Sequence, residues 1–588
     1  MAKVNIKIEG VSYQVEEGLT ILEAAKACGY EIPSLCTFNH GECSTGSCRV
    51  CLVEVKGARG LVASCVYPVN EGMEISISTP KASEARRASV ELLLSNHNQN
   101  CQQCDKNGQC ELLHVAAVTG AREGRYQGAK TPTTLDQLTP SIVRDTSKCI
   151  LCGRCVERCK NAHGMGILGF ENRGFNTIVA PAENRSFANS PCILCGQCVS
   201  VCPTGALMEK SEIGKVDAAF KAGKHVVVQT APAVRAALGE EFGLPIGTPV
   251  TGKMVAALKR LGFHKVYDTN FAADLTIMEE GTELLSRIQG GGTLPMITSC
   301  SPGWVNYAEY NYSDLLDHLS TCKSPHQMQG AIIKSYYAEK NDIEPKDIFV
   351  VSIMPCTAKK DEKEREQMQV DGIKDVDAVL TTRELARMIK RAGILFNRLP
   401  DEEFDQDLMG EYTGAGVIFG VTGGVMEAAL RTVYYVLTGK EHEAIKFEQV
   451  RGFEGIREAS LDIDGTVVNV AIAHGMKNAK VLLDEIREGK SKYHFIEIMG
   501  CPGGCIAGGG QPYVRSCFLP NEDDDIMDTY KEKRAKALYS EDERQTLRQS
   551  HNNPQIKKLY DEFLGKPNSH KTHELLHTSY NGRVGFND

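Results

Sequence analysis

The pattern of apolar and polar residues at the N-terminus predicts short strands and helices. MAKVNIKIEGVSYQVEEG at 1–18 alternates apolar and polar side chains, which indicates a β-hairpin. Two stretches, TILEAAKACG at 20–29 and SEARRASVELLLSNH at 83–97, carry apolar residues at helical spacing. The polar stretch TGAREGRYQGAKTPTTLDQLTP that follows at 119–140 is typical of a linker. We therefore expect small α+β modules in this part of the chain.

From about residue 215 the pattern changes to long apolar runs separated by amphipathic stretches. Three runs have the length and composition of buried strands: HVVVQTAP at 225–232, GTLPMITSC at 292–300 and DIFVVSIMPC at 347–356. GKMVAALKRLGF at 252–263 has the pattern of a helix, and such alternation predicts an α/β domain. Beyond about residue 520 the chain is charged and helical, and we interpret it as a packing appendage rather than a site. The expected fold class is therefore multi-domain, α+β followed by α/β.

Length, charge and cysteine usage narrow the class of protein, because 588 residues exceed what one hydrophobic core holds. The net charge of −9 is modest and no long basic run occurs, which argues against a nucleic-acid partner. The N-terminus lacks the apolar core of a signal peptide, and no stretch reaches membrane-spanning length. Most of the 23 cysteines fall in C-x-x-C groups, which in a reducing compartment are metal ligands. These features predict a cytoplasmic metalloprotein without a membrane partner.

An internal repeat carries the strongest motif of the sequence. KCILCGRCVERCK at 148–160 and PCILCGQCVSVCP at 191–203 both contain C-x2-C-x2-C-x3-C. With this spacing three thiolates bind one 4Fe-4S cubane and the fourth binds the other. A pair of structural zinc sites is the alternative, which the interlocked spacing disfavours. We expect one cluster on Cys149, Cys152, Cys155 and Cys202, and the other on Cys192, Cys195, Cys198 and Cys159.

The first cysteine group follows the predicted hairpin and helix. Four cysteines are spaced C-x11-C-x2-C-x13-C, a spread around one loop that suits a flat 2Fe-2S cluster in a ferredoxin-like module. Cys28 and Cys43 fall outside this frame, and we interpret them as buried or spare thiols. The predicted 2Fe-2S ligands are Cys36, Cys48, Cys51 and Cys65.

A histidine precedes the next cysteine group, in the pattern H-x3-C-x2-C-x5-C formed by His97, Cys101, Cys104 and Cys110. One imidazole in place of a thiolate changes the charge and potential of a cluster, so a further 4Fe-4S site is expected here. The alternative is a helix-end histidine, with the cluster held by the three cysteines and an outside ligand. The first 210 residues thus predict four accessory clusters, one 2Fe-2S and three 4Fe-4S.

The large domain has its own candidate ligands at strand ends and in a glycine-rich turn, where backbone can approach a bulky cofactor. They lie in TSCSPGW at 298–304, MPCTAKK at 354–360 and MGCPGGCIAGGGQP at 499–512. The alternative role, a buried structural thiol, fits Cys322 and Cys517 better than it fits the cysteines of these three motifs. GVTGGV at 420–425 lacks the context of a nucleotide-binding fingerprint, so flavin and NAD(P) are expected on partner subunits. The candidate ligands are Cys300, Cys356, Cys501 and Cys505.

These three motifs, behind the ferredoxin-like modules and the His97 group, resemble the iron-only (FeFe) hydrogenases over nearly the whole chain. The chain is similar in particular to the catalytic subunits of multi-subunit NAD(P)-linked hydrogenases. The resemblance implies an H-cluster, a 4Fe-4S cubane joined through one cysteine to a two-iron unit that carries CO, cyanide and a bridging dithiolate amine. Cys356, Cys501 and Cys505 match the cubane ligands, with Cys505 in the bridging position.

One position departs from the family pattern. The first motif of the family has two adjacent cysteines, of which the first passes protons to the bridging amine and the second binds the cubane. Cys300 matches the proton relay, whereas Ser301 stands in the ligand position. A serine alkoxide binds iron as a harder ligand than thiolate and would change the potential and stability of the cubane. Alternatively Cys300 becomes the ligand, or no complete H-cluster assembles.

The resemblance also assigns residues around the two-iron unit and along a proton route. Ala233 and His326 occupy places where other polar side chains are usual in the family. Without the resemblance, the Glu280, Glu283 and Arg287 face of a helix would be interpreted as solvated surface charge. The matching residues are Pro232, Met354, Lys359, Phe419 and Met499 at the two-iron unit, and Glu280, Glu283, Arg287 and Ser320 in the proton route.

These assignments predict five domains and one main activity. The activity is reversible oxidation of H2 with electrons passed along the accessory clusters, in a hetero-oligomer whose partners are flavin- and NAD(P)-binding diaphorase-type subunits, a 2Fe-2S subunit and ferredoxin. Whether electrons are bifurcated between two acceptors stays open. The alternative is a hydrogenase-like electron-transfer or sensory subunit that lacks a functional H-cluster. The expected domains are 1–80 (2Fe-2S), 81–121 (His/Cys 4Fe-4S), 140–212 (two 4Fe-4S), 215–520 (H-cluster) and 521–588 (helical tail).

Overall fold

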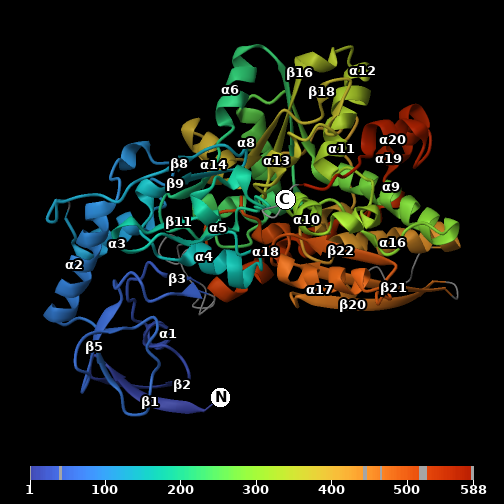
Figure 1. Cartoon of the computed structure of the whole chain (residues 1–588). Helices are drawn as coiled ribbons and strands as arrows, with labels where there is room; N and C mark the ends of the chain where they lie inside the picture. Colours follow the sequence, from blue (N-terminus) through green and yellow to red (C-terminus); the bar gives the residue numbers. More distant parts are fainter. Residues whose placement is uncertain are drawn as a thin grey trace. The chain divides into compact units, whose positions relative to one another are not determined.

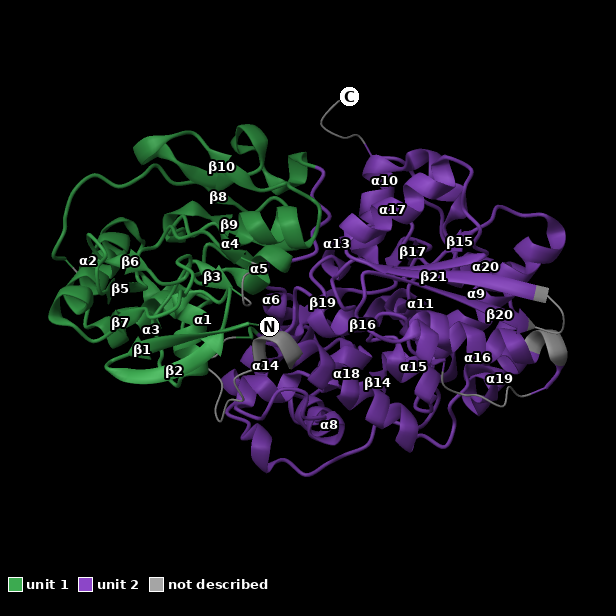
Figure 2. Cartoon of the chain, turned by 90° about the horizontal axis from the view of Figure 1, so that it is seen from below, with its two compact units in different colours: residues 1–190, 197–208, 513–529 green, residues 191–196, 209–512, 530–588 purple. Residues whose placement is uncertain are grey.

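The computed structural model of the protein describes residues 2–38, 43–122, 124–440, 447–463, 466–514 and 526–583 (Figure 1). The chain divides into two compact units, which are green and purple in Figure 2. Unit 1 comprises residues 1–190, 197–208 and 513–529, and unit 2 comprises residues 191–196, 209–512 and 530–588. No helix in the described ranges is long and apolar enough to cross a membrane.

A five-stranded sheet and helix α1 (Ile21–Ala27) form the N-terminal part of unit 1, as the alternating pattern predicts. Strand β1 is antiparallel to β2 and parallel to β7. Helix α1 begins after Thr20, whose hydroxyl accepts from the Glu23 N–H while the Glu23 carboxylate accepts from the Thr20 N–H. The strand order is β2 (Val11–Glu16), β1 (Lys3–Ile8), β7 (Glu74–Ser76), β5 (Leu52–Val55) and β6 (Val62–Ala63).

The rest of unit 1 combines two packed helices with short strands around the cysteine repeat. The stretch expected to be a linker contains strand β8, and its Asp136 is buried, accepting from the Phe187 N–H at 2.9 Å and the Ser186 hydroxyl at 2.7 Å. The linker prediction was therefore wrong at this point, because one buried carboxylate ties the segment to the fold. The elements are α2 (Pro80–Asn96), α3 (Glu111–Thr119), β8 (Leu135–Asp136), β9 (Ile142–Asp145), α4 (Arg154–Glu157), β10 (Gly169–Glu171), β11 (Ile178–Ala180), α5 (Gln197–Val201) and β12 (Leu207–Glu209).

Unit 2 contains two four-stranded sheets rather than one. The first is parallel throughout, and its strands are buried on both faces, which explains their continuous apolar runs. The run at 292–300 forms only the two-residue strand β15, which belongs to the second sheet. The first sheet has the order β14 (Lys265–Asp268), β13 (His225–Thr230), β16 (Ile348–Met354) and β19 (Ala378–Thr381), and the second β15 (Met296–Ile297), β22 (Phe495–Met499), β21 (Thr466–His474) and β20 (Ile456–Ile463).

Helix α9 (Thr269–Gly290) packs into the cores of both sheets. Phe271 and Leu275 belong to the core around the first sheet, and Ile277 and Leu284 to the core around the second. A helix buried on two sides holds its polar side chains in fixed positions inside the unit. Other helices of unit 2 are α6 (Ile213–Lys221), α7 (Pro232–Arg235), α8 (Thr251–Arg260), α10 (Pro302–Asn311), α11 (Pro325–Ile332), α13 (Lys359–Glu362), α14 (Thr382–Arg391), α15 (Gly414–Ile418), α16 (Gly424–Thr438) and α17 (Met476–Arg487).

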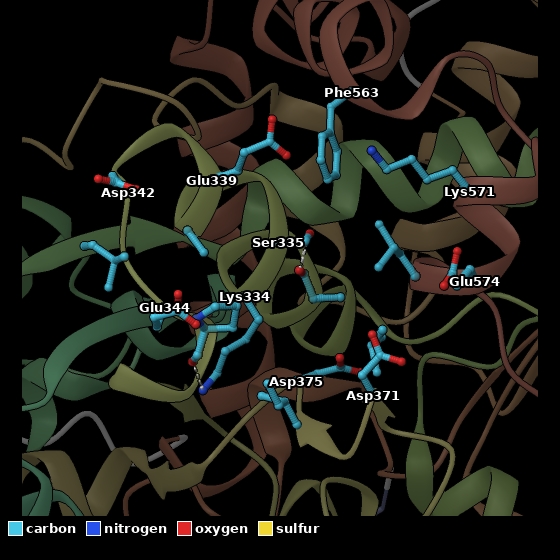
Figure 3. Close-up of a pocket in the computed structure, with 17 residues that line it drawn as sticks. Lys334, Ser335, Glu339, Asp342, Glu344, Asp371, Asp375, Phe563, Lys571 and Glu574 are labelled. Atoms are coloured by element: carbon cyan, nitrogen blue, oxygen red, sulfur yellow. Dashed lines mark hydrogen bonds between the residues drawn. The ribbon is translucent and has the colours of Figure 1, made fainter.

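The tail, residues 526–583, contains α18 (Ile526–Arg544), α19 (Pro554–Leu559), η16 (Tyr560–Leu564) and α20 (His570–Leu576). Arg534 pairs with Glu240 at 2.5 Å and Asp542 with Arg431 at 3.0 Å, with all four side chains buried. Removing one partner of such a pair costs about 3–5 kcal/mol, so the tail is integral to unit 2. Figure 3 shows a cavity lined by Phe563 and Lys571 of the tail and by Glu339, and none of the predicted site residues lines it.

Candidate active site and cluster sites

The predicted H-cluster residues lie around one cavity in unit 2. Strands β13 and β16 of the first sheet and β15 and β22 of the second all end close to it in sequence. The cavity is partly open to solvent. Its lining includes Pro232, Cys300, Ser301, His326, Met354, Cys356, Lys359, Phe419, Met499, Cys501 and Cys505. Residues far apart in sequence are thus brought together as the resemblance implies.

The motif TSCSPGW forms the turn between β15 and α10. Ser301 is the N-cap residue of α10, and Pro302 takes the first helical position, where its missing N–H costs nothing. Trp304, the chain's one tryptophan, is fully buried, and its indole N–H donates to the Thr298 carbonyl oxygen at 2.9 Å. This hydrogen bond closes the turn and fixes the position of Cys300 and Ser301 at the cavity wall.

The Ser301 hydroxyl has a defined partner. Its oxygen accepts a hydrogen bond from the Gly500 N–H at 3.0 Å, immediately before Cys501. The hydroxyl therefore lies in the same wall as the candidate sulfur ligands, in the position that the family fills with a cysteine. Oxygen keeps a further lone pair after accepting one hydrogen bond, so iron binding by Ser301 is chemically compatible with this contact.

The donor atoms at the cavity fit an iron–sulfur cofactor. Burial raises the pKa of the Cys356 and Cys505 thiols to about 12 and that of Cys300 well above its usual range. Three cysteine sulfurs around a cavity are soft donors suited to an iron–sulfur cluster, and the Ser301 oxygen adds one harder donor. Because ligands must lose their protons, binding of iron by these buried thiols would release protons and couple strongly to pH.

The glycine-rich turn after Cys501 is required for backbone packing. A Cβ on Gly508 would lie 2.2 Å from the Pro355 carbonyl oxygen, and one on Gly504 would lie 2.7 Å from the Thr422 N–H nitrogen. Both glycines also line the cavity. The glycines thus let the Cys505 turn approach the Cys356 loop closely, in addition to leaving room at the cavity.

Two charged residues next to the cavity form a buried network with His326. Lys359 donates to the Cys300 carbonyl oxygen at 3.1 Å and pairs with Glu362 at 2.9 Å. The same carboxylate lies 2.5 Å from His326 Nε2. Burial and then the Lys359 charge lower the pKa of His326 to about 4, so the ring is neutral at pH 7. The sequence marked His326 as unusual for the family. It gave no sign of a role for Glu362, because Glu362 lies in no recognisable motif.

The predicted proton route lies along α9 and is buried. Glu280 is 3% and Glu283 8% exposed, so they are not the solvated surface charges that their helical spacing alone would indicate. Arg287 pairs with Glu283 at 2.6 Å, and the Ser320 hydroxyl donates to Glu283 at 3.0 Å. Burial, followed by the Glu283 charge, raises the pKa of Glu280 to about 8. Glu280 therefore carries a proton at pH 7, and when it is ionised its negative charge adds to burial in raising the pKa of Cys300.

In unit 1 the predicted 2Fe-2S ligands converge. The Cys36 thiol is in hydrogen-bond contact with Cys48 and then Cys65, and these contacts lower its pKa. Cys51 contacts Cys65 in the same way, which lowers the pKa of Cys51 to about 6. All four side chains are buried. Four thiols in mutual contact fit a compact cluster, while Cys43 is buried and Cys28 half-buried outside this group.

The surroundings of the first cysteine repeat and of the His97 group also suit iron–sulfur clusters. Cys149, Cys152, Cys155 and Cys202 line one cavity, so the structure brings Cys202 close to the three cysteines of the first repeat, as the predicted crossover requires. His97 caps the C-terminus of α2, and its buried Nδ1 has no hydrogen-bond partner among the described residues. A buried nitrogen without a partner suits a metal ligand. Of the other three residues, Cys104 lies against Gly205, where a Cβ would be 2.6 Å from Cys104 Sγ, and Cys110 caps α3, while Cys101 begins a short 3-10 turn.

The second repeat set divides between the units: Cys159 and Cys198 belong to unit 1, and Cys192 and Cys195 to unit 2. Within unit 2, the Thr357 hydroxyl donates to the Leu194 carbonyl oxygen at 2.7 Å. A Cβ on Gly509 would lie 2.2 Å from the Cys195 carbonyl oxygen. The segment 191–196 therefore packs directly against the loops that carry Cys356 and Cys505. Cys322 is buried as expected, and Cys517 lies outside the described residues.

Family models match nearly the whole length of the chain. Residues 224–509 match the iron only hydrogenase large subunit, C-terminal domain, and residues 528–583 the iron hydrogenase small subunit. Residues 1–80 match a 2Fe-2S iron-sulfur cluster binding domain and residues 148–206 a 4Fe-4S dicluster domain. Residues 86–125 match the NADH-ubiquinone oxidoreductase-G iron-sulfur binding region. The expected succession of ferredoxin-like domains and a large H-cluster domain is confirmed.

Individual proteins support the same assignment. The chain is 49% identical to the NADP-reducing hydrogenase subunit HndD of Solidesulfovibrio fructosivorans, with 99% of each chain covered. It is 43% identical to iron hydrogenase 1 of Clostridium pasteurianum over 98% of this chain and 99% of that protein. A solved [FeFe]-hydrogenase, HydA1 from Chlamydomonas reinhardtii, is 42% identical with a TM-score of 0.56 and covers 63% of this chain and 99% of that one. The chain therefore belongs to the iron-only hydrogenases, with iron–sulfur cluster domains ahead of its H-cluster domain.

Proposed function

We propose that this chain is the catalytic subunit of a cytoplasmic hydrogenase that oxidises H2 and reduces protons reversibly at an H-cluster. Cys356, Cys501, Cys505 and Ser301 would hold the cubane, with Cys505 joining it to the two-iron unit. The observation that carries the proposal is the single cavity on which these four residues and Cys300 converge. When bound, the H-cluster supplies the redox chemistry that splits H2 into two protons and two electrons or forms it from them.

The residues of the chain would shape the cavity and move protons. Pro232, Met354, Phe419 and Met499 would exclude water from the cavity, and Lys359 would place a positive charge at its wall. Cys300 would hold or release a proton at the cavity, and the protonated Glu280 would restore it. Ser320, Glu283 and Arg287 complete the proposed route, which gains support from the 3.0 Å and 2.6 Å contacts of Glu283. Proton transfer needs such hydrogen-bond distances between successive groups.

Electrons would pass along four accessory clusters, one 2Fe-2S and three 4Fe-4S. Segment 191–196 packs against the Cys356 and Cys505 loops. This packing supports the proposal that the second repeat cluster is the accessory cluster that exchanges electrons directly with the active site. Because a similar chain is named an NADP-reducing hydrogenase subunit, we infer flavin- and NAD(P)-binding diaphorase-type partners, a 2Fe-2S subunit and ferredoxin. Electron bifurcation between NAD(P) and ferredoxin would fit the same assembly.

Isotope exchange between D2 and water tests the proposal, because it requires the cavity and the proton route but not long-range electron transfer. The full chain, matured with the H-cluster, should form HD, and a Cys51→Ala variant should exchange at the same rate while losing electron transfer from partners. A matured full chain that binds iron but forms no HD would contradict the proposal.

A second candidate function is favoured by Ser301 alone. If the Ser301 oxygen, held by the Gly500 N–H, does not bind iron, the cubane lacks a fourth ligand. The chain would then transfer electrons or sense redox state without activating H2. Retention of all accessory clusters together with absence of D2 exchange would establish this alternative.

A further inference from the structure

The tail supplies hydrogen bonds to a buried carboxylate beside the proposed proton route. The Tyr560 hydroxyl donates to Glu279 Oε1 at 2.5 Å, and the Asn568 N–H donates to Oε2 at 2.8 Å. His577 Nε2 lies 3.2 Å from the same Oε2. Glu279 directly precedes Glu280 on α9. The tail thus reaches the helix that carries the route, although its sequence was interpreted only as a packing appendage.

The other ring nitrogen of His577 faces the segment that holds Glu283. His577 Nδ1 lies 2.7 Å from the Thr321 hydroxyl, and the Thr321 N–H donates to both carboxylate oxygens of Glu283, at 3.2 and 3.1 Å. Backbone hydrogen bonds of 2.7 and 2.8 Å join residues 576–578 to residues 321–323. His577 is therefore held in a fixed position next to Glu283 by both its side chain and its backbone.

His577 lies close both to Glu283 and to the exposed His573. One ring nitrogen of His577, one carboxylate oxygen of Glu283 and the Cys322 sulfur lie within 4.8 Å of one another. One water molecule spans such a gap between the nitrogen and the oxygen. On the outer side, the exposed His573 stacks on His577 with ring centroids 4.2 Å apart. An imidazole has two ring nitrogens, so it can accept a proton on one and donate a proton from the other.

Arg287, the outermost residue of the matched route, cannot do this. A guanidinium keeps its proton at all ordinary pH values. Arg287 donates to Glu283 at 2.6 Å and to the Leu319 carbonyl oxygen at 2.8 Å, so it orients the carboxylate. Glu283 needs a neighbour that can both accept and donate a proton, and His577 is a group of that kind with a ring nitrogen within 4.8 Å of a Glu283 carboxylate oxygen.

We propose that His577 is a further proton-transfer residue, through which protons pass between solvent and Glu283. The inference rests on the proposed proton route. A proton taken up on one ring nitrogen is matched by release of the proton on the other, which passes to the Glu283 carboxylate and leaves His577 neutral. The charged and titratable groups around the ring are Glu279 and Glu283 from α9, Cys322 from the 321–323 segment, Tyr560 from η16 and His573 from α20.

The activity test replaces His577 by groups that cannot carry a proton. His577→Gln keeps a hydrogen-bond donor for Glu279, and we expect D2–water exchange to fall roughly fivefold, short of the ~100-fold expected when a sole proton donor is lost. The pH profile of exchange should change in this variant. In His577→Gly, added imidazole should restore exchange. The matched control is His551→Gln, which changes a buried tail histidine 3.2 Å from the Thr432 hydroxyl and should alter neither rate nor profile.

A structural role for His577 would give a different result. If His577→Gln and His551→Gln lower thermal stability and rate alike, with an unchanged pH profile and no rescue by imidazole, the proposal is overturned. If the His577→Gly variant does not fold, the rate and pH profile of His577→Gln still test the proposal.

A second measurement separates this inference from the proposed function. Isotope-edited infrared titration of labelled histidine in the full chain should show a signal that is missing in His577→Gln. The signal should shift in Glu283→Gln, because the neighbouring carboxylate is replaced by a neutral amide. An unchanged signal would overturn the inference even in an active enzyme. A chain without hydrogenase activity that still shows the shift would refute the proposed function and leave the coupling of His577 to Glu283 standing.

Discussion

The cluster modules of unit 1 and the cavity of unit 2 bring their predicted ligand residues together in opposite ways. In unit 1 a few turns of chain supply most of a ligand set, as for Cys149, Cys152 and Cys155. The cavity draws its lining from Pro232 to Cys505, across two sheets and several helices. The comparison teaches that a local motif depends on spacing alone, whereas the cavity depends on the packing of a whole domain. A changed ligand such as Ser301 therefore acts in a site whose other walls are fixed by distant residues.

The largest effect is expected for Cys501→Ala, which removes one sulfur from the assembled cavity. All hydrogen turnover and all infrared bands of metal-bound CO and cyanide should disappear, because Cys501 is a proposed cubane ligand. Iron in the unit 1 clusters should remain, since their ligands are local. Infrared spectroscopy and iron analysis check this, with Cys28→Ser as the control thiol outside every ligand set. Retained CO and cyanide bands in Cys501→Ala would break the comparison.

Glu280→Gln should lower D2–water exchange by about a hundredfold or more, because a buried proton donor is lost.

The same variant tests whether the buried Glu280 side chain is neutral in the folded protein. The carboxyl group has a folded-state pKa of about 8, against an ordinary value of 4.5. Its contribution to stability is therefore fully present below pH 4.5 and is lost as the pH rises to about 8, by at most about 1.4 kcal/mol per pH unit. Denaturant unfolding of the parent should show this slope, and Glu280→Gln should lack it. Equal slopes would contradict a neutral Glu280.

Cys202→Ala tests the same comparison in unit 1. The cavity in unit 1 joins Cys202 to the three cysteines of the first repeat, so even a local module borrows one ligand. We expect loss of the cluster held by Cys149, Cys152 and Cys155, about four iron atoms, with the H-cluster infrared bands unchanged. Electron paramagnetic resonance of the reduced protein measures the loss. Disappearance of a different cluster would show that the ligand sets are not interlocked in this way.

The smallest effect is expected for Ser301→Cys. If oxygen binds the cubane, a thiolate should shift its potential and raise cofactor retention or turnover by roughly tenfold. If Cys300 is the ligand instead, Ser301→Cys should change little, and Cys300→Ser should destabilise the cubane rather than only block proton delivery. Redox titration followed by infrared spectroscopy distinguishes the two. Unchanged iron, bands and activity in both variants would favour the electron-transfer alternative.

Sequence predicts this molecule well where chemistry is local. The spacing of the cysteines indicated the cluster modules, and the resemblance located the cavity lining, because each residue sits in a short motif. Period-two alternation gave β1 and β2, and continuous apolar runs gave β13 and β16. These features depend on neighbouring residues alone.

Sequence failed where a role depends on tertiary contacts. Asp136 lies in a polar stretch that looks like a linker, and only its contact with residues 186–187 makes it structural. Glu362 becomes important through His326, and His577 through Glu279, partners that are 36 and 298 residues away. The helical spacing of Glu280 and Glu283 gave no sign that α9 is buried on two sides. No pattern within one segment encodes such contacts.

Infrared spectroscopy of the matured full chain tests the central claim most directly, because metal-bound CO and cyanide absorb where protein does not. If the cavity formed by Cys356, Cys501, Cys505 and Ser301 holds a complete H-cluster, the parent chain should show CO and cyanide bands that change when H2 is added. A matured chain with full accessory clusters and no such bands would contradict the account.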